Sequence, residues 1–184
     1  MKFSVYIANL KAYNEGYPRG KWLDLPVNVR HGEDIEEALE KELASIGVGK
    51  LGEPGITSEE FFIADYENNI DYKVPQHQPL YDLNYLAQEL AKIECEGQSE
   101  LNWVLAYHEA LGGTLFEALD HYREYSFYPE MTVYDVAKDA IENGVYGPIP
   151  MSIQNAINYN YLAESDFDYL KDTKYGCISV RKDQ

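Results

Sequence analysis

An acidic, amphipathic stretch at residues 33–46 constrains the fold of this chain more than any other segment. At 100° per residue, Ile35, Leu39, Leu43 and Ile46 fall on one face, the pattern of a helix packed against a core. The opposite face carries four acids at spacings i, i+3, i+4 and i+7: Glu33, Glu36, Glu37 and Glu40. Like charges at these spacings repel one another by about 0.2–0.5 kcal/mol per pair. The segment predicts a helix with one buried face and one anionic face.

The excess of acids lies in the interior of the sequence. The 184 residues carry a formal net charge of −17. Residues 31–172 hold seven bases and 29 acids, a net of −22, whereas the segments on either side are slightly basic. Such a field repels nucleic acid and anionic membranes and attracts basic partners. Because 45% of the residues are hydrophobic and 14% are aromatic, the acidity does not indicate disorder.

Hydrophobic patterns predict an α+β chain of three small domains. These are a β-β-α-β unit over 1–76, a helical middle domain over 77–122 and an α+β domain over 123–184. Strands are expected at 3–8, 21–25, 61–66 and 175–180. Helices are expected at 35–46, 83–93 and 101–111 and, after caps at Thr114, Thr132 and Ser152, at 115–122, 133–143 and 153–161.

Two later helices repeat the acidic geometry of the first. Their acids stand opposite the apolar positions, at i, i+3, i+7 in one helix and at i, i+4, i+7 in the other. An ordinary surface helix also places charge opposite its apolar face, but it mixes both signs. The repetition therefore favours a functional anionic surface over a merely solvated one. The two sets are Glu117, Asp120 and Glu124, and Asp135, Asp139 and Glu142.

Motifs for catalysis and for metal binding are weak in this sequence. The run from His108 to Gly112 lacks the second histidine of the helical zinc motif His-Glu-x-x-His. The sequence contains neither a glycine-rich phosphate loop nor a Gly-x-Ser-x-Gly elbow. A pair of carboxylates could hydrolyse a glycoside, but among 32 acids any pair can be proposed. We therefore expect no enzyme activity, no cofactor and no metal ion.

The sequence also indicates where the chain resides. Its start lacks the basic and apolar regions of a signal peptide, and no apolar run is long enough to span a bilayer. The two cysteines, Cys95 and Cys177, form neither a metal-binding spacing nor a disulfide framework. We expect a cytoplasmic protein with reduced thiols.

Several runs of residues, in the same order along the chain, resemble the ArdA antirestriction family. The most specific lies near the N-terminus, where Val5-Tyr6-Ile7-Ala8-Asn9-Leu10 is followed by Tyr13-Asn14-Glu15-Gly16 and by Trp22. The other matching runs are Ile63-Ala64-Asp65-Tyr66-Glu67, Tyr134-Asp135-Val136-Ala137, and Gly147-Pro148-Ile149-Pro150 with Ser152, Gln154 and Asn155.

The resemblance implies an elongated, three-domain α+β protein that dimerises through its C-terminal region. Members of the family mimic bent B-form DNA and occupy the DNA-binding groove of type I restriction–modification enzymes. They inhibit restriction, and often modification, and are typically carried by plasmids and conjugative transposons. If this chain acts in the same way, its partners are such an enzyme and a second copy of itself, rather than nucleic acid or a membrane.

In this interpretation, carboxylates take the place of DNA phosphates. Two alternatives are an acidic module that binds another basic DNA-binding protein and a small carboxylate-dependent hydrolase. The candidate phosphate surrogates are Glu33, Glu36, Glu37, Glu40, Glu67, Asp71, Asp82, Glu89, Glu94, Glu96, Glu117, Asp120, Glu124, Asp135, Asp139 and Glu142.

Overall fold

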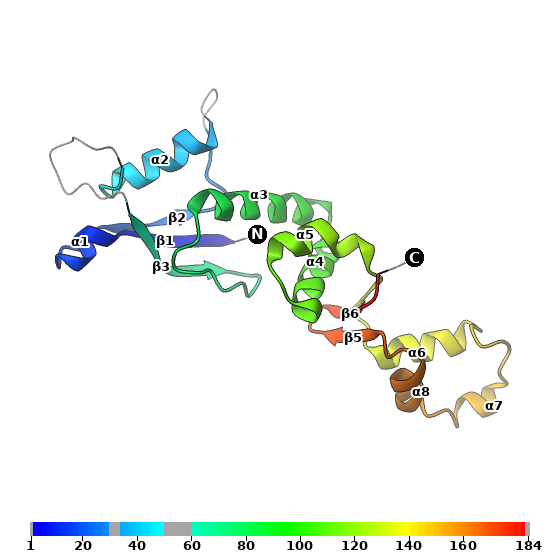
Figure 1. Cartoon of the computed structure of the whole chain (residues 1–184). Helices are drawn as coiled ribbons and strands as arrows, with labels where there is room; N and C mark the ends of the chain where they lie inside the picture. Colours follow the sequence, from blue (N-terminus) through cyan, green and yellow to red (C-terminus); the bar gives the residue numbers. More distant parts are fainter. Residues whose placement is uncertain (1, 30–33, 50–59, 183–184) are drawn as a thin grey trace. The chain divides into compact units, whose positions relative to one another are not determined.

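The computed structural model describes residues 2–29, 34–49 and 60–182 (Figure 1). The chain forms two compact units, Met1–Lys92 and Ile93–Gln184. Helices are combined with two small antiparallel sheets of three strands each, so the predicted α+β class is confirmed. The finer division into three domains at residues 76 and 122 stays a prediction.

The first unit contains the strands and the acidic helix expected from the sequence, and one short helix in addition. That helix, α1, occupies part of the segment between the first two strands. Helix α3 begins in the first unit and ends in the second. The elements are β1 (Phe3–Asn9), α1 (Leu10–Asn14), β2 (Gly20–Asp24), α2 (Ile35–Ser45), β3 (Phe61–Asn68) and α3 (Leu80–Glu96).

Strand β1 is the centre of the first sheet, whose order is β2-β1-β3. Phe3, Val5 and Ile7 alternate along it and are fully buried, as the period of two predicted. Lys21 of β2 lies opposite Ile7 and forms an ion pair with Glu42 of α2, which places α2 over this face. Figure 1 shows α2 and α3 on the same side of the sheet. The opposite face of the sheet carries the side chains that alternate with the core residues.

Asn9 connects three elements of the first unit through a side chain that is 0% exposed. Its Oδ1 accepts a hydrogen bond from the backbone N–H of Ala12 at 2.9 Å and thereby caps α1. Its Nδ2 donates to the carbonyl of Gly47 at 2.9 Å, just after α2. The amide thus fixes the end of β1, the start of α1 and the end of α2 together.

Replacing Asn9 by alanine should lower the free energy of unfolding of the first unit by about 2–4 kcal/mol. The lost cap accounts for about 1 kcal/mol, and the carbonyl left without its partner accounts for about 1–3 kcal/mol. Urea denaturation followed by circular dichroism measures the change. The control is Asn14→Ala at the exposed end of the same helix. Equal stabilities of the two variants would contradict this role of Asn9.

In the second unit, threonine caps start two of the helices as predicted. Thr114 and Thr132 each form a capping box, with Glu117 and Asp135 respectively. The elements are α4 (Gln98–Leu111), α5 (Leu115–His121), the 3₁₀ helix η1 (Tyr122–Glu124), β4 (Phe127–Pro129), α6 (Val133–Glu142), α7 (Met151–Gln154), α8 (Tyr159–Asp166), β5 (Leu170–Thr173) and β6 (Gly176–Ser179).

The single helix predicted from Ser152 to Tyr161 is wrong. The chain forms a four-residue helix after Pro150 and then a separate helix, α8. The side chain of Asn158 accepts a hydrogen bond from the N–H of Tyr161 at 3.2 Å, which starts the second helix afresh. Asparagine prefers this capping position to a helix interior, because its side chain competes with the helical backbone hydrogen bonds.

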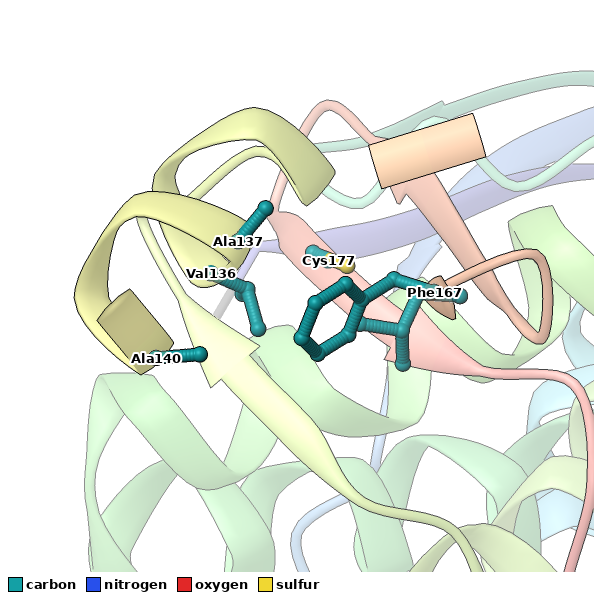
Figure 2. Close-up of a cluster of buried hydrophobic side chains, with 6 residues drawn as sticks. Val136, Ala137, Ala140, Phe167 and Cys177 are labelled. Atoms are coloured by element: carbon teal, nitrogen blue, oxygen red, sulfur yellow. The ribbon is translucent and has the colours of Figure 1, made fainter. Parts of the chain in front are cut away.

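The second sheet has the order β4-β6-β5 and is covered on both faces. Ile178 of β6 pairs with Phe127, and Trp103 of α4 stacks on the Phe127 ring at 6.1 Å, so this face meets α4. Cys177 points to the other face, as neighbouring strand residues do. There it packs in a cluster with Phe167 and residues of α6, as Figure 2 shows. Burial of all four β6 residues follows from this double coverage.

Candidate functional site

The acidic face of α2 has the predicted arrangement in the described residues. Asp34 caps the helix by accepting a hydrogen bond from the N–H of Glu37 at 2.7 Å. Glu36, Glu37 and Glu40 are exposed, whereas Leu39 on the opposite face is buried. Glu37 is paired with Lys41 at 3.1 Å, one turn further along the helix. The fourth predicted member, Glu33, lies outside the described residues.

The second set of acids does not lie on one helix. Glu117 Oε2 accepts a hydrogen bond from the N–H of Thr114 at 2.7 Å and so belongs to the cap of α5. Asp120 is exposed on α5. Glu124 follows the end of that helix, in η1. Its hydrogen bonds from Lys182 and from His121 hold the pKa of its carboxyl below the usual range.

The third set lies on α6 as predicted, but its members differ in what they contact. Asp135 completes the capping box, and hydrogen bonds from the side chain and backbone of Thr132 lower the pKa of its carboxyl. Glu142 lies 3.8 Å from Lys138. Asp139 is exposed.

The remaining candidates are spread over β3, α3 and the loop between them. Asp82 is exposed in the first turn of α3, where a negative charge suits the helix dipole. Asp71 and Glu94 are not free of interactions. Three others form ion pairs: Glu67 with Lys2 at 2.5 Å, Glu89 with Lys92 at 2.5 Å, and Glu96 with Arg123 at 2.9 Å.

Five of the nominated acids are exposed and have no ion pair or side-chain hydrogen bond to any residue that the structure describes. We call them the unpaired carboxylates. They belong to α2, α3, α5 and α6. The unpaired carboxylates are Glu36, Glu40, Asp82, Asp120 and Asp139.

The structure adds two strand acids that the helix-based search of the sequence did not single out. Asp24 of β2 and Asp65 of β3 project from the sheet face opposite α2, together with Glu67. A bulge between Tyr6 and Ile7 shifts the register of β3, so that Asp65 and Glu67 share this face. Strict alternation along β3 would have placed Asp65 on the same face as the buried Ile63. Because the bulge places them on opposite faces, the exposure of Asp65 on this face could not be predicted from the sequence.

Other titratable groups do not form a recognisable catalytic or metal site in the described part of the chain. No group of three or more His, Cys, Asp or Glu side chains there is arranged to hold a metal ion. Desolvation lowers the pKa of His108, which is half-buried on α4. Burial raises the pKa of the Cys177 thiol to about 12, so it stays protonated and is a poor nucleophile at neutral pH.

No helix among the described residues has both the length and the apolar character needed to cross a bilayer.

Comparison with known proteins identifies the family. A search of curated proteins gives no match. The family model described as antirestriction protein (ArdA) matches residues 5–177. That match covers nearly the whole chain and includes every run of residues on which the resemblance was based. The prediction of the family is therefore confirmed, and the chain belongs to the ArdA family of antirestriction proteins.

Proposed function

We propose that this chain is a protein mimic of B-form DNA that occupies the DNA-binding groove of type I restriction–modification enzymes. It inhibits restriction and, by covering the same groove, modification. The observation that carries the proposal is the set of unpaired carboxylates, which project from four different helices without a neutralising cation among the described residues. Membership of the antirestriction family supports the choice of partner.

Carboxylates can replace phosphates because much of DNA-binding affinity comes from charge rather than from base contacts. Duplex DNA carries one charge per about 1.7 Å of its axis. Glu36 and Glu40 lie four residues apart, about 6 Å along the helix axis, so additional acids are needed to approach that density. The net charge of −17 supplies them. Such inhibition needs no nucleophile, cofactor or metal ion.

The first test removes the negative charge of the unpaired carboxylates one at a time, with Glu→Gln or Asp→Asn. Each single variant should weaken inhibition of a purified type I enzyme about 1.5-fold to fivefold, because one exposed charge contributes little. All five changes together should weaken it on the order of 10²-fold, since separated sites add in free energy. The readout is the inhibitor concentration that halves DNA cleavage.

Glu164→Gln is the matched control, because this acid is exposed on α8 and lies outside the candidate set. Its inhibition should equal that of the unchanged protein. Complete loss of inhibition after a single acid-to-amide change outside the five unpaired carboxylates would point to a carboxylate-dependent hydrolase instead. Wild-type protein that captures other basic DNA-binding proteins but no type I subunit would contradict the proposed partner.

The proposed assembly is a homodimer formed through the C-terminal unit. Apolar side chains around α7 support this part of the proposal, because Met151 is 79% exposed and Ile153 is 55% exposed. Val145 and Tyr161 are also exposed. Several exposed apolar side chains within a short segment are typical of an interaction surface. A second copy of the chain can bury them.

The double variant Met151→Asp/Ile153→Asp should therefore be a monomer at concentrations at which the unchanged protein is a dimer. The two introduced aspartate side chains would otherwise be buried in the interface without a neutralising cation, which costs several kcal/mol per charge. Light scattering after size-exclusion chromatography measures the mass. Tyr17→Asp, an equally exposed position in the first unit, is the control and should leave the dimer intact. A dimeric double variant would place the interface elsewhere.

A further inference from the structure

The sheet face of the first unit that is turned away from α2 combines two aromatic rings with three acids. We call it the aromatic–acidic face. The strand register arranges these side chains in two rows across β2, β1 and β3. One row is Trp22, Tyr6 and Asp65, and the other is Asp24, Ser4 and Glu67.

The two rings of the first row form an ordered platform. Tyr6 and Trp22 meet edge to face, with their ring centres 5.5 Å apart. Gly20 makes room for this packing, because a Cβ atom there would lie 2.7 Å from the Tyr6 ring. Trp22 is nevertheless 44% exposed, although burying an indole ring is one of the larger favourable contributions to stability. The two rings thus pack against each other, the Tyr6 ring lies against Gly20, and the Trp22 ring is open to solvent.

The second row already binds a cation from the chain itself. Lys2 forms an ion pair with Glu67 at 2.5 Å. The hydrogen bond and charge of Glu67, and to a smaller extent the charge of Asp24, raise the pKa of the Lys2 ammonium. Ser4 donates a hydrogen bond to Asp24 at 2.6 Å. Both acids of this row, Asp24 and Glu67, therefore have a hydrogen-bond or ion-pair partner within the first unit.

Asp65 in the first row has no ion pair with any described residue, and one of its oxygens accepts a hydrogen bond from the N–H of Tyr66. The row thus presents an exposed indole beside a phenol ring and an unneutralised carboxylate. Aromatic rings would also suit a nucleic-acid base, but the acids on this face repel a phosphate backbone. The negative charge of this face therefore favours binding of a cation.

We propose that the row of Trp22, Tyr6 and Asp65 binds an arginine side chain of a basic protein partner. The planar guanidinium stacks on an aromatic ring and donates hydrogen bonds to a carboxylate, which a lysine ammonium does less well. The chemistry of this site follows from the sheet face alone. The identity of the partner as a restriction–modification enzyme rests on the proposed function.

The first experiment observes the site directly. The chain contains two tryptophans, Trp22 and Trp103, so two indole N–H signals are expected in a ¹⁵N–¹H correlation spectrum. Titration with a capped tetra-arginine peptide should shift the Trp22 signal to saturation and leave the Trp103 signal in place. Tetra-lysine should bind this site about threefold to thirtyfold more weakly, from the range measured for cation–aromatic contacts.

Asp65→Asn should weaken the tetra-arginine titration by a similar factor without unfolding the sheet, since the side chain is exposed. Trp22→Phe, which assigns the signal, keeps a smaller aromatic surface. Glu164→Gln is the charge control and should leave the titration unchanged. A Trp22 signal that does not move on addition of tetra-arginine would overturn the proposal. So would a Trp22 signal that responds equally to tetra-arginine and tetra-lysine and that responds to tetra-arginine equally in Asp65→Asn and in the unchanged protein.

The second experiment tests whether this site contributes to inhibition of a type I enzyme. If wild-type protein inhibits a type I enzyme, Trp22→Ala and Asp65→Asn should each weaken inhibition about threefold to thirtyfold, whereas Tyr17→Ala and Glu164→Gln should not. Unchanged inhibition by both site variants would overturn the proposal while leaving the proposed function intact. If the wild-type protein does not inhibit, the proposed function fails, and the peptide titration alone decides whether the site binds arginine.

Discussion

Raising the NaCl concentration from about 50 to 200 mM should weaken binding of this protein to a type I enzyme on the order of 10²–10³-fold. Each DNA phosphate contact contributes a slope of about −0.9 to the logarithmic dependence of affinity on salt. Five unpaired carboxylates acting as phosphate surrogates give the expected range if each behaves in the same way. The measurement is the dissociation constant at four salt concentrations, by displacement of a labelled inhibitor.

The control is the variant in which all five unpaired carboxylates are changed to amides. It should bind more weakly at low salt and show a flatter salt dependence, so the two affinities approach each other as salt increases. Direct binding is preferable to cleavage as a readout, because the enzyme's own contact with DNA also weakens with salt. An affinity that stays constant across the range would contradict electrostatic mimicry.

Replacing Phe167 by alanine should reduce the free energy of unfolding of the second unit by about 3–5 kcal/mol. The ring lies in the cluster that joins the end of α8 to α6 and to Cys177 of β6 (Figure 2). Truncation removes its contacts and leaves a cavity that α6, held by its capping box, can fill only in part. Urea denaturation measures the loss, and near-ultraviolet circular dichroism reports the packing of the aromatic side chains.

Glu164→Ala is the matched control for this core variant. Glu164 lies on the same helix, α8, but is exposed, so its removal should change stability by no more than about 0.5 kcal/mol. If Phe167→Ala were as stable as Glu164→Ala, the cluster would not be what holds α8 to the sheet.

Some parts of this structure were encoded in short stretches of sequence. Alternation predicted β1, and the spacing of Leu39 and Ile46 predicted α2, because burying one face of an element needs a matching period of apolar residues. Thr114 and Thr132 predicted where α5 and α6 begin, since a cap is made between residues three positions apart. The family was predicted in the same way, from short runs of residues.

The short elements were not predicted, because their stability comes from neighbours distant in sequence. Strands β4 and β5 have three and four residues, too few for a periodic pattern, and exist by pairing with β6. Helix α1 depends on Asn9, whose side chain also reaches the end of α2. Four residues, 155–158, separate α7 from α8 within a stretch that has helical spacing, and the last of them, Asn158, caps α8.

The acidic residues show most clearly which features the sequence determines and which the tertiary structure determines. The sequence by itself determined that acids stand opposite the apolar faces of α2 and α6, because 3.6 residues per turn fix that relation. Only the tertiary structure decided which acids keep an uncompensated charge. Lys2 reaches Glu67, Arg123 reaches Glu96 and Lys182 reaches Glu124 across 65, 27 and 58 positions of sequence. Ion pairs depend on distance in space, and chain folding sets that distance independently of helical periodicity.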